Sequence, residues 1–296
     1  MYQKVGLKSR IVIFGCGYVG GELAHSCLER GWQVTALTRN KNKADSLLKS
    51  GVETVVADLH STDWHKKIST EQDYLVNCVG AAEPSINGYI NSYRMGMKSI
   101  LKWTEQANSS FDTLLFTSST SVYPQTDGSF VSEESNHMGI SERGKVLLDA
   151  EDLCRKASVA RFKRRFVLRF AGLYGPGRHL LINQIMAGKK IRGSGKRILN
   201  LLHQKDAADA ILACLDSDNP EISGTYNVAD DRHASRAEIV EWVAKRLDLK
   251  NPGFVEIEQP GHPDRRVVSE NIREIFNWKP KFPGFEVGYE DLLATL

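Results

Sequence analysis

Residues 10–20 read RIVIFGCGYVG, and this stretch decides the fold. Its first part, RIVIF, is almost entirely apolar, as expected of a strand that is buried on both faces of a parallel sheet. A helical pattern then runs from residue 18 to residue 30 and ends at Gly31, a common signal for a helix C-terminus. A strand, a glycine-rich turn and a helix in this order predict the first βαβ unit of a parallel sheet.

The turn itself carries the G-x-G-x-x-G pattern of dinucleotide-binding loops, at Gly15, Gly17 and Gly20. The first glycine permits the tight turn, the second lets a pyrophosphate approach the backbone, and the third lets the helix pack on the strand. Free N–H groups at the helix N-terminus attract the anion. The predicted cofactor loop also includes Cys16, Tyr18 and Val19. The alternative is a structural turn that holds no ligand.

The alternation of strands and helices continues through the first half of the chain. β-Branched runs predict five more strands, and longer amphipathic stretches predict helices between them. We therefore expect an α/β fold, a Rossmann-type doubly wound parallel sheet. The predicted strands after the first are residues 33–37, 53–57, 74–79, 113–116 and 166–170, and the next long helices are residues 89–106 and 142–156.

After residue 171 the pattern loosens, because Gly and Pro cluster in AGLYGPGRH. We expect residues 1–171 to form the dinucleotide-binding domain and residues 172–296 to form mainly a smaller α/β substrate lobe, with residues 203–228 returning to the sheet. In this half, helices are predicted at residues 180–187, 204–216, 236–247 and 270–276, and short strands at residues 225–228 and 254–257.

The end of the second predicted strand bears on the choice between NAD and NADP. NAD enzymes place an acidic residue there to bond the ribose 2′-hydroxyl, whereas this chain reads LTRNKNK at residues 37–43. The guanidinium of Arg39 suits a 2′-phosphate, and Lys41 and Lys43 follow it. NADP is therefore the favoured cofactor. The alternative is that Arg39 only caps the strand end.

Composition excludes several other classes of protein. The chain is 41% hydrophobic and 25% charged, with a net charge of +3, too small to suggest a nucleic-acid or membrane partner. Its five cysteines are scattered and lack CxxC spacing, which argues against a disulfide framework and against a metal site. No stretch is apolar enough to span a bilayer, and a cytoplasmic protein is expected.

Several further segments, in chain order, resemble one known family. They are DL at 58–59, NCVGAA at 77–82, SSTSVYP at 118–124, RFAGLYGPG at 169–177 and NLLHQKD at 200–206. With the glycine loop, these segments make the chain similar to the extended and atypical short-chain dehydrogenase/reductases, the NAD-dependent epimerase/dehydratase superfamily. Within it, the chain most resembles a bacterial subgroup that shares GWxV, SSTSVY and AGLxGPGRH.

The resemblance implies roles for individual residues. Catalytic roles fall to Ser119, which holds the substrate oxygen, and to Lys145, which also bonds the nicotinamide ribose. A substrate role falls to His203, and Arg178 suits an anionic substrate. Further cofactor contacts fall to Asp58, Leu59, Val79, Gly80, Ala81 and Ser118. For Lys145 the alternative is an exposed helix lysine.

One expected residue is missing. The family places a Tyr, the general acid/base, four residues before the Lys, but this chain has Ser141 there. A phenol titrates near pH 10 and an aliphatic hydroxyl far higher, so Ser141 is a poor substitute. Tyr123, Tyr174 and His179 are the candidate replacements, and His137 lies close by in the sequence. Each of them is more often structural than catalytic.

Three hypotheses about function follow. The first is an oxidoreductase, epimerase or dehydratase that acts on a small sugar-like hydroxyl or carbonyl substrate. The second is an NADP-binding sensor or regulator with little turnover, which Ser141 favours. The third is a structural module, possible for any Rossmann fold. Members of this family often dimerise through two long helices that flank the central sheet. In this chain, a homodimer would therefore form through residues 89–106 and 142–156.

Overall fold

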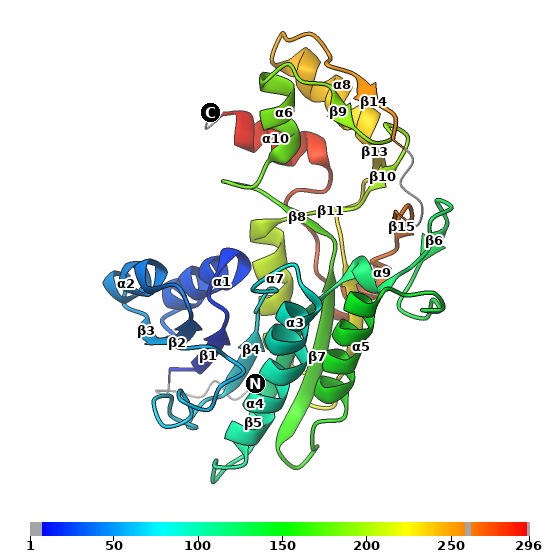
Figure 1. Cartoon of the computed structure of the whole chain (residues 1–296). Coiled ribbons are helices and arrows are strands. Elements are labelled where there is room, and N and C mark those ends of the chain that lie inside the picture. Colours follow the sequence, from blue (N-terminus) through cyan, green and yellow to red (C-terminus); the bar gives the residue numbers. More distant parts are fainter. Residues whose placement is uncertain (1–7, 258–261, 295–296) are drawn as a thin grey trace. The chain divides into compact units, whose positions relative to one another are not determined.

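The computed structural model describes residues 8–257 and 262–294 (Figure 1). The chain forms two compact units. Unit 1 comprises residues 1–118, 142–168 and 208–225, and unit 2 comprises residues 119–141, 169–207 and 226–296.

A seven-stranded sheet confirms the predicted α/β Rossmann-type fold. Its order is β12-β7-β5-β4-β1-β2-β3, and the five strands from β3 to β5 are parallel. The apolar run RIVIF is β1, whose last four residues are buried. The strands are β1 (Arg10–Phe14), β2 (Gln33–Thr38), β3 (Glu53–Val56), β4 (Tyr74–Asn77), β5 (Phe111–Ser119), β7 (Phe162–Phe170) and β12 (Gly224–Val228).

The helices of unit 1 differ from the sequence prediction in two places. The predicted single helix at 89–106 is a run of three elements, in which the π-helix η1 (Ile90–Met95) joins α3 (Ile86–Tyr89) to α4 (Gly96–Thr104). The unpredicted α2 (Lys41–Lys49) begins after Asn40, whose side chain caps it. The other helices are α1 (Tyr18–Glu29) and α5 (Glu142–Arg155), while α7 (Gln204–Leu215) crosses between the units. Figure 1 shows α3 and α4 alongside α5, with which both are in contact.

The core of unit 1 is built around aromatic rings. Phe14 on β1 lies 5.1 Å from Trp64 and 5.9 Å from Trp103, centroid to centroid. Phe111 continues the cluster to Phe162, at 5.5 Å. All five side chains are at most 1% exposed. Tilted and edge-on ring contacts of this kind add to the stabilisation that burial provides.

Unit 2 has a separate apolar core between helices and short strand pairs. Its helices are α6 (Leu180–Met186), α8 (Arg236–Arg246), α9 (Glu270–Phe276) and α10 (Phe285–Leu293), the last of which was not predicted. A capping box of Ser235 and Glu238 begins α8. The strand pairs are β8 (Gly172–Tyr174) with β11 (Leu201–His203), β9 (Ile191–Arg192) with β14 (Phe254–Val255), β10 (Ile198–Leu199) with β13 (Ala234–Ser235), and β6 (Phe130–Val131) with β15 (Arg266–Val267).

The boundaries of the two units in the sequence differ from those of the predicted domains. The predicted boundary at residue 171 falls three residues after β7 passes from unit 1 into unit 2, and residues 119–141 belong to unit 2. The strands β5 and β12 also contain a unit boundary, so a single cut in the chain does not separate the units. Among the described residues, no helix is both long and apolar enough to cross a bilayer.

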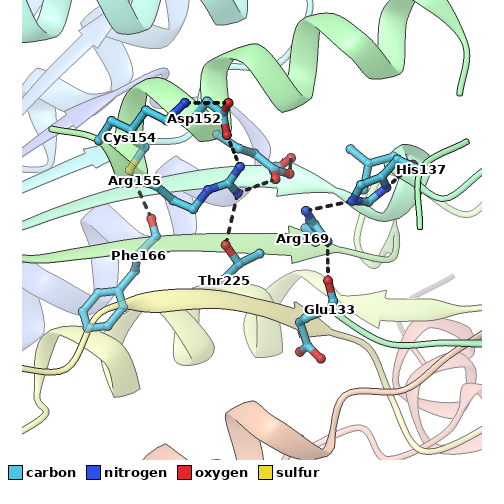
Figure 2. Close-up of polar contacts among 12 residues, drawn as sticks. Glu133, His137, Asp152, Cys154, Arg155, Phe166, Arg169 and Thr225 are labelled. Carbon is cyan, nitrogen blue, oxygen red and sulfur yellow. Dashed lines mark hydrogen bonds and ion pairs between the residues drawn. The ribbon is translucent and has the colours of Figure 1, made fainter. Parts of the chain in front are cut away.

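A buried carboxylate ties α5 to the sheet in unit 1. Glu151 is fully buried, and one of its oxygens accepts a hydrogen bond of 2.6 Å from Ser118 Oγ on β5. Arg155 donates to the other oxygen at 3.1 Å and also contacts Asp152 and Thr225 (Figure 2). Burying a charge is costly unless it is paired, so Arg155 stabilises the position of α5.

We therefore expect Arg155→Met to lower the free energy of unfolding by about 1–2 kcal/mol, because it removes a charged partner from a buried carboxylate. The matched control is Lys156→Met, which removes an exposed ion pair with Asp152 and is expected to cost at most about 0.5 kcal/mol. Urea unfolding followed by circular dichroism measures both. Equal stability of the two variants would show that Arg155 contributes no more than a surface pair.

Candidate functional site

The glycine loop between β1 and α1 is tightly constrained at two of its glycines. Gly15 has a φ of +84°, and a Cβ built on it would lie 2.6 Å from Val79 Cα. A Cβ on Gly20 would lie 2.6 Å from the carbonyl oxygen of Gly15. A side chain at residue 15 would collide with the backbone of Val79, and one at residue 20 would push α1 away from the turn, so both glycines are required for packing.

Gly17 is different, because a Cβ there would meet nothing nearer than the Gly15 oxygen at 4.0 Å. Packing alone does not require a glycine at this position. Gly17 is also the N-cap of α1, with no side-chain cap and no acidic residue in the first turn of the helix. The helix therefore presents its N-terminal N–H groups beside an open cradle, which fits an anionic diphosphate.

The other loop residues anchor this cradle. The backbone N–H groups of Gly15 and Cys16 both donate to the Leu37 carbonyl of β2, at 2.9 and 3.3 Å. The buried Cys16 thiol donates to the Gly20 carbonyl at 3.1 Å. Cys16 and Val19 have buried side chains, so their predicted contact with a cofactor would use the backbone.

The residues that follow β2 and β3 come together. Arg39 Nε lies 3.6 Å from Asp58 Oδ1, and both side chains are about half exposed. Leu59, next to Asp58, is buried. The structure thus joins Arg39, predicted to bind the 2′-phosphate, to Asp58, a predicted cofactor contact, in one exposed ion pair.

The loop after β4 lies on the other side of the glycine turn. The N–H of Val79 donates to Asn77 Oδ1 at 3.2 Å, and the N–H of Ala81 donates to the hydroxyl of Tyr93 in η1 at 3.0 Å. These two amides are therefore already paired. Gly80 between them has no atom within 4 Å of a built Cβ, so the loop is open at that residue.

The predicted catalytic residues are divided between the units. Lys145 is exposed on α5 in unit 1, whereas Ser119 and Ser141 belong to unit 2. The hydroxyl oxygen of Ser119 accepts from the Ser121 N–H at 3.1 Å and caps the short 3-10 helix η2 (Thr120–Val122). Ser141 is exposed immediately before α5.

Tyr123, one proposed replacement for the missing tyrosine, is fully buried in unit 2. Its hydroxyl donates to Asn227 Oδ1 at 2.7 Å and accepts from Arg169 Nη1 at 2.9 Å. Burial raises the pKa of Tyr123, although the Arg169 charge opposes the shift. A buried phenol with both roles occupied and a raised pKa is poorly suited to proton transfer.

His137 is held in the same network. Its Nδ1 lies 2.9 Å from the Val122 carbonyl oxygen, which only accepts, so this nitrogen carries a proton. Its Nε2 faces Arg169 Nη2, a donor, at 3.5 Å (Figure 2). Arg169 also donates to the Glu133 carbonyl. The imidazole is thus fixed in one tautomer and stacks on the Tyr123 ring.

Tyr174 is 3% exposed, and its hydroxyl has no hydrogen-bond partner among the described residues. Burial and nearby Asp230 raise its pKa well above the ordinary value. The ring of His203 meets Tyr174 edge-on at 5.2 Å, and burial lowers the pKa of this histidine to about 4. Both residues therefore lie in the interior of unit 2, not on its surface.

Two predicted residues stand at the start of α6. Arg178 is exposed, and His179 is the partly buried N-cap of the helix, with no side-chain cap hydrogen bond. Its Nδ1 is buried without a hydrogen-bond partner among the described residues. Of the three proposed proton donors, His179 is the one that is neither a raised-pKa phenol nor fully buried.

A group of cations in unit 2 was not predicted from the sequence. Arg265 is 7% exposed, and Nη2 donates to the Thr120 carbonyl at 2.7 Å. Its Nε and Nη1 have no hydrogen-bond partner among the described residues. Arg197 contacts His262, and the charges of Arg197, Arg236 and Arg265 help to lower the pKa of that histidine, after burial. The run DRR at 264–266 was the available signal.

No group of three or more metal-ligating side chains occurs in the described parts of the chain. The polar groups gathered here instead suit an organic anion. In unit 1 these are the glycine cradle and the residues after β2 and β3, and in unit 2 the cations around Arg265.

Comparison with known proteins gives a consistent result. The model of the NAD dependent epimerase/dehydratase family matches residues 11–229. Protein YeeZ of Escherichia coli strain K12 is 27% identical over 251 residues, which cover 83% of this chain and 86% of YeeZ. The expected resemblance to the bacterial subgroup that contains YeeZ is thereby confirmed.

Two solved structures are similar over nearly the whole chain. One is a putative NAD-dependent epimerase/dehydratase from Methylobacillus flagellatus, with 26% identity, a TM-score of 0.76 and coverage of 98% of this chain and 99% of the other. The second is the UDP-glucuronic acid 4-epimerase from Bacillus cereus, solved with UDP-glucuronic acid and NAD. It has 20% identity, a TM-score of 0.81 and coverage of 97% and 99%.

Buried Asp230 in unit 2 makes stability depend on pH. One of its oxygens, Oδ2, has no partner among the described residues, and burial raises its pKa to about 8. An unfolded aspartate titrates near pH 3.9. The folded state therefore holds a proton that the unfolded state releases between pH 4 and 8. Stability from this group is complete below pH 4 and is lost as the pH rises to 8, by roughly 1.4 kcal/mol per pH unit at most.

We expect Asp230→Asn, which mimics the protonated carboxyl, to be progressively more stable than the wild type from pH 4 to pH 8. Thermal melts across this range measure the difference. The matched control is Asp231→Asn, which loses an ion pair with Arg273 and is expected to show no such gain. A constant difference between Asp230→Asn and the wild type would contradict the raised pKa.

Proposed function

The chain belongs to the NAD-dependent epimerase/dehydratase family, and we propose that it binds NADP in preference to NAD and acts as an oxidoreductase or epimerase on a small sugar-like substrate. The observation that carries the cofactor assignment is the cradle at Gly17, where the uncapped α1 faces open space. The bound cofactor would supply hydride chemistry. Arg39 at the end of β2, in place of an acidic residue, supports NADP.

We assign roles to this chain's residues from the family motifs that they match. Ser119 would hold the substrate oxygen, and Lys145 would bond the nicotinamide ribose. Lys145 is exposed and Ser119 partly exposed, which is compatible with contact to ligands. The usual proton donor is replaced by Ser141, and His179 is the favoured substitute, because Tyr123 and Tyr174 are buried with raised pKa values.

The substrate assignment rests on cations in unit 2. Arg178 is exposed, and Arg265 keeps two guanidinium nitrogens without partners among the described residues. A buried guanidinium whose N–H groups lack acceptors favours an anionic ligand group, because burying N–H donors without hydrogen bonds costs free energy. We therefore favour a substrate that carries a phosphate or carboxylate. A homodimer through residues 89–106 and 142–156 is part of the same proposal.

The second candidate is an NADP-binding sensor or regulator with little turnover. It is favoured by the same buried tyrosines, because neither Tyr123 nor Tyr174 can take the place of the missing phenol without rearrangement. The two candidates share the cofactor and differ in whether hydride leaves it.

NADPH fluorescence, followed against a panel of nucleotide sugars and small aldehydes, separates the two candidates. Oxidation with any substrate supports the enzyme, whereas tight NADPH binding without oxidation supports the sensor. We further expect Ser141→Tyr to raise any turnover by roughly 100-fold, the contribution of a positioned general acid. The control is Glu142→Tyr, which places a phenol one residue away. Equal rates in both variants would show that residue 141 is not the site of the lost proton donor.

A further inference from the structure

The π-helix η1 directs two adjacent side chains at the loop that follows β4 in unit 1. Ser92 Oγ accepts a hydrogen bond from the N–H of Ala82 at 3.0 Å. The hydroxyl oxygen of Tyr93 accepts one from the N–H of Ala81, also at 3.0 Å. Two successive amides of the loop are therefore bonded to two successive residues of the helix.

The π geometry explains how neighbouring residues can face the same loop. At the end of η1 the N–H of Gly96 donates to the Asn91 carbonyl, five residues earlier, as in a π-helix. This wider turn rotates adjacent side chains by less than the roughly 100° per residue of an α-helix. In a regular α-helix, one of Ser92 and Tyr93 would point further away from the loop.

Both acceptors are fixed by their surroundings. Ser92 is 6% exposed, and the ring of Tyr93 meets Phe116 on β5 edge-on at 6.2 Å. Burial raises the pKa of Tyr93, and the bond from the Ala81 N–H acts against that shift. η1 continues into α4, whose Trp103 lies in the aromatic core. The helix is thus a firm support, and the two bonds act on the loop.

The loop that these bonds hold packs against the glycine turn. A Cβ built on Gly15 would lie 2.6 Å from both the backbone nitrogen and the Cα of Val79, two residues before Ala81. The N–H of Cys78 donates to the Phe14 carbonyl at 2.7 Å, which joins the same loop to the end of β1. A displacement of the loop would therefore move one wall of the turn in which the cradle lies.

We propose that Tyr93 and Ser92 are positioning residues, which hold residues 79–82 in the conformation that receives the dinucleotide. The inference rests on the proposed function, because it takes this loop to line the bound cofactor. Both side chains act through backbone amides of the loop. A loop that is ordered before binding loses less conformational entropy when the ligand arrives, so the ligand binds more tightly.

The test compares Tyr93→Phe with Tyr89→Phe in the full-length protein, with dissociation constants measured by nicotinamide fluorescence. Tyr93→Phe removes the acceptor for Ala81 and keeps the ring, so the dissociation constant of NADPH is expected to rise about fivefold to tenfold. The same factor is expected for NADH, because the loop and the end of β2 lie on opposite sides of β1.

Tyr89→Phe is the matched control. Its ring lies 5.3 Å from that of Tyr93, and its hydroxyl makes no hydrogen bond to the described residues. The control is therefore expected to bind NADPH within about twofold of the wild type. An equal loss of affinity in both variants would overturn the proposal, because the bond to Ala81 would not be its cause.

Amide hydrogen exchange distinguishes positioning from a general loss of stability. In the cofactor-free Tyr93→Phe variant, the Ala81 amide is expected to exchange faster, while β4 and β5 keep the exchange rates of the wild type. Saturating NADPH is expected to restore protection of this amide. Faster exchange throughout the sheet would overturn the proposal, because the hydroxyl would then stabilise the whole of unit 1.

The outcomes also separate this inference from the proposed function. A wild type that binds neither NADPH nor NADH overturns both. If the wild type binds NADPH and Tyr93→Phe binds it equally well, the positioning role is overturned and the cofactor assignment stands.

Discussion

The structure of unit 1 depends on the absence of two methyl groups. Because Gly15 and Gly20 carry no Cβ, the turn after β1 packs directly against Val79 and the start of α1 packs against the turn. This close approach places the N-terminus of α1 at the carboxyl end of β1, beside the residues that follow β2 and β3. Gly17, which packing does not require, then leaves the open space that a diphosphate fits.

In unit 2, the two tyrosines that could replace the missing proton donor are buried. Tyr123 is locked between Arg169 and Asn227, and Tyr174 lies in the apolar core beside His203. Burial raises the pKa of each phenol, the opposite of what a general acid/base needs near neutral pH. Burial therefore makes both tyrosines poor candidates for the general acid/base role that the family resemblance assigns to the position of Ser141.

Much of the fold was predictable because its signals are local. The run RIVIF indicates a strand of the sheet, the glycine spacing indicates the loop, and the residues from Ser235 onward indicate α8. Each of these signals lies within a few adjacent residues. The π-helix within residues 89–106 was not predicted from the helical pattern. The hydroxyl of Tyr93, which lies in it, accepts a hydrogen bond from the N–H of Ala81 outside the helix, and a local pattern does not reveal such contacts. Burial was not predictable for the same reason. The residues adjacent to Tyr123 and Arg265 in the sequence do not reveal that the phenol is paired on both sides or that two guanidinium nitrogens have no partner among the described residues.

We propose that the cradle at Gly17 binds the cofactor diphosphate. The most direct test of this binding is calorimetric titration of NADPH into the wild type and Gly17→Val. The Cβ of the new side chain would enter the cradle with the Gly15 oxygen, 4.0 Å away, as its nearest neighbour. We expect the variant to keep the melting temperature of the wild type and to lose at least about 100-fold in NADPH affinity, or roughly 2.7 kcal/mol. Equal affinity of the two proteins would contradict it.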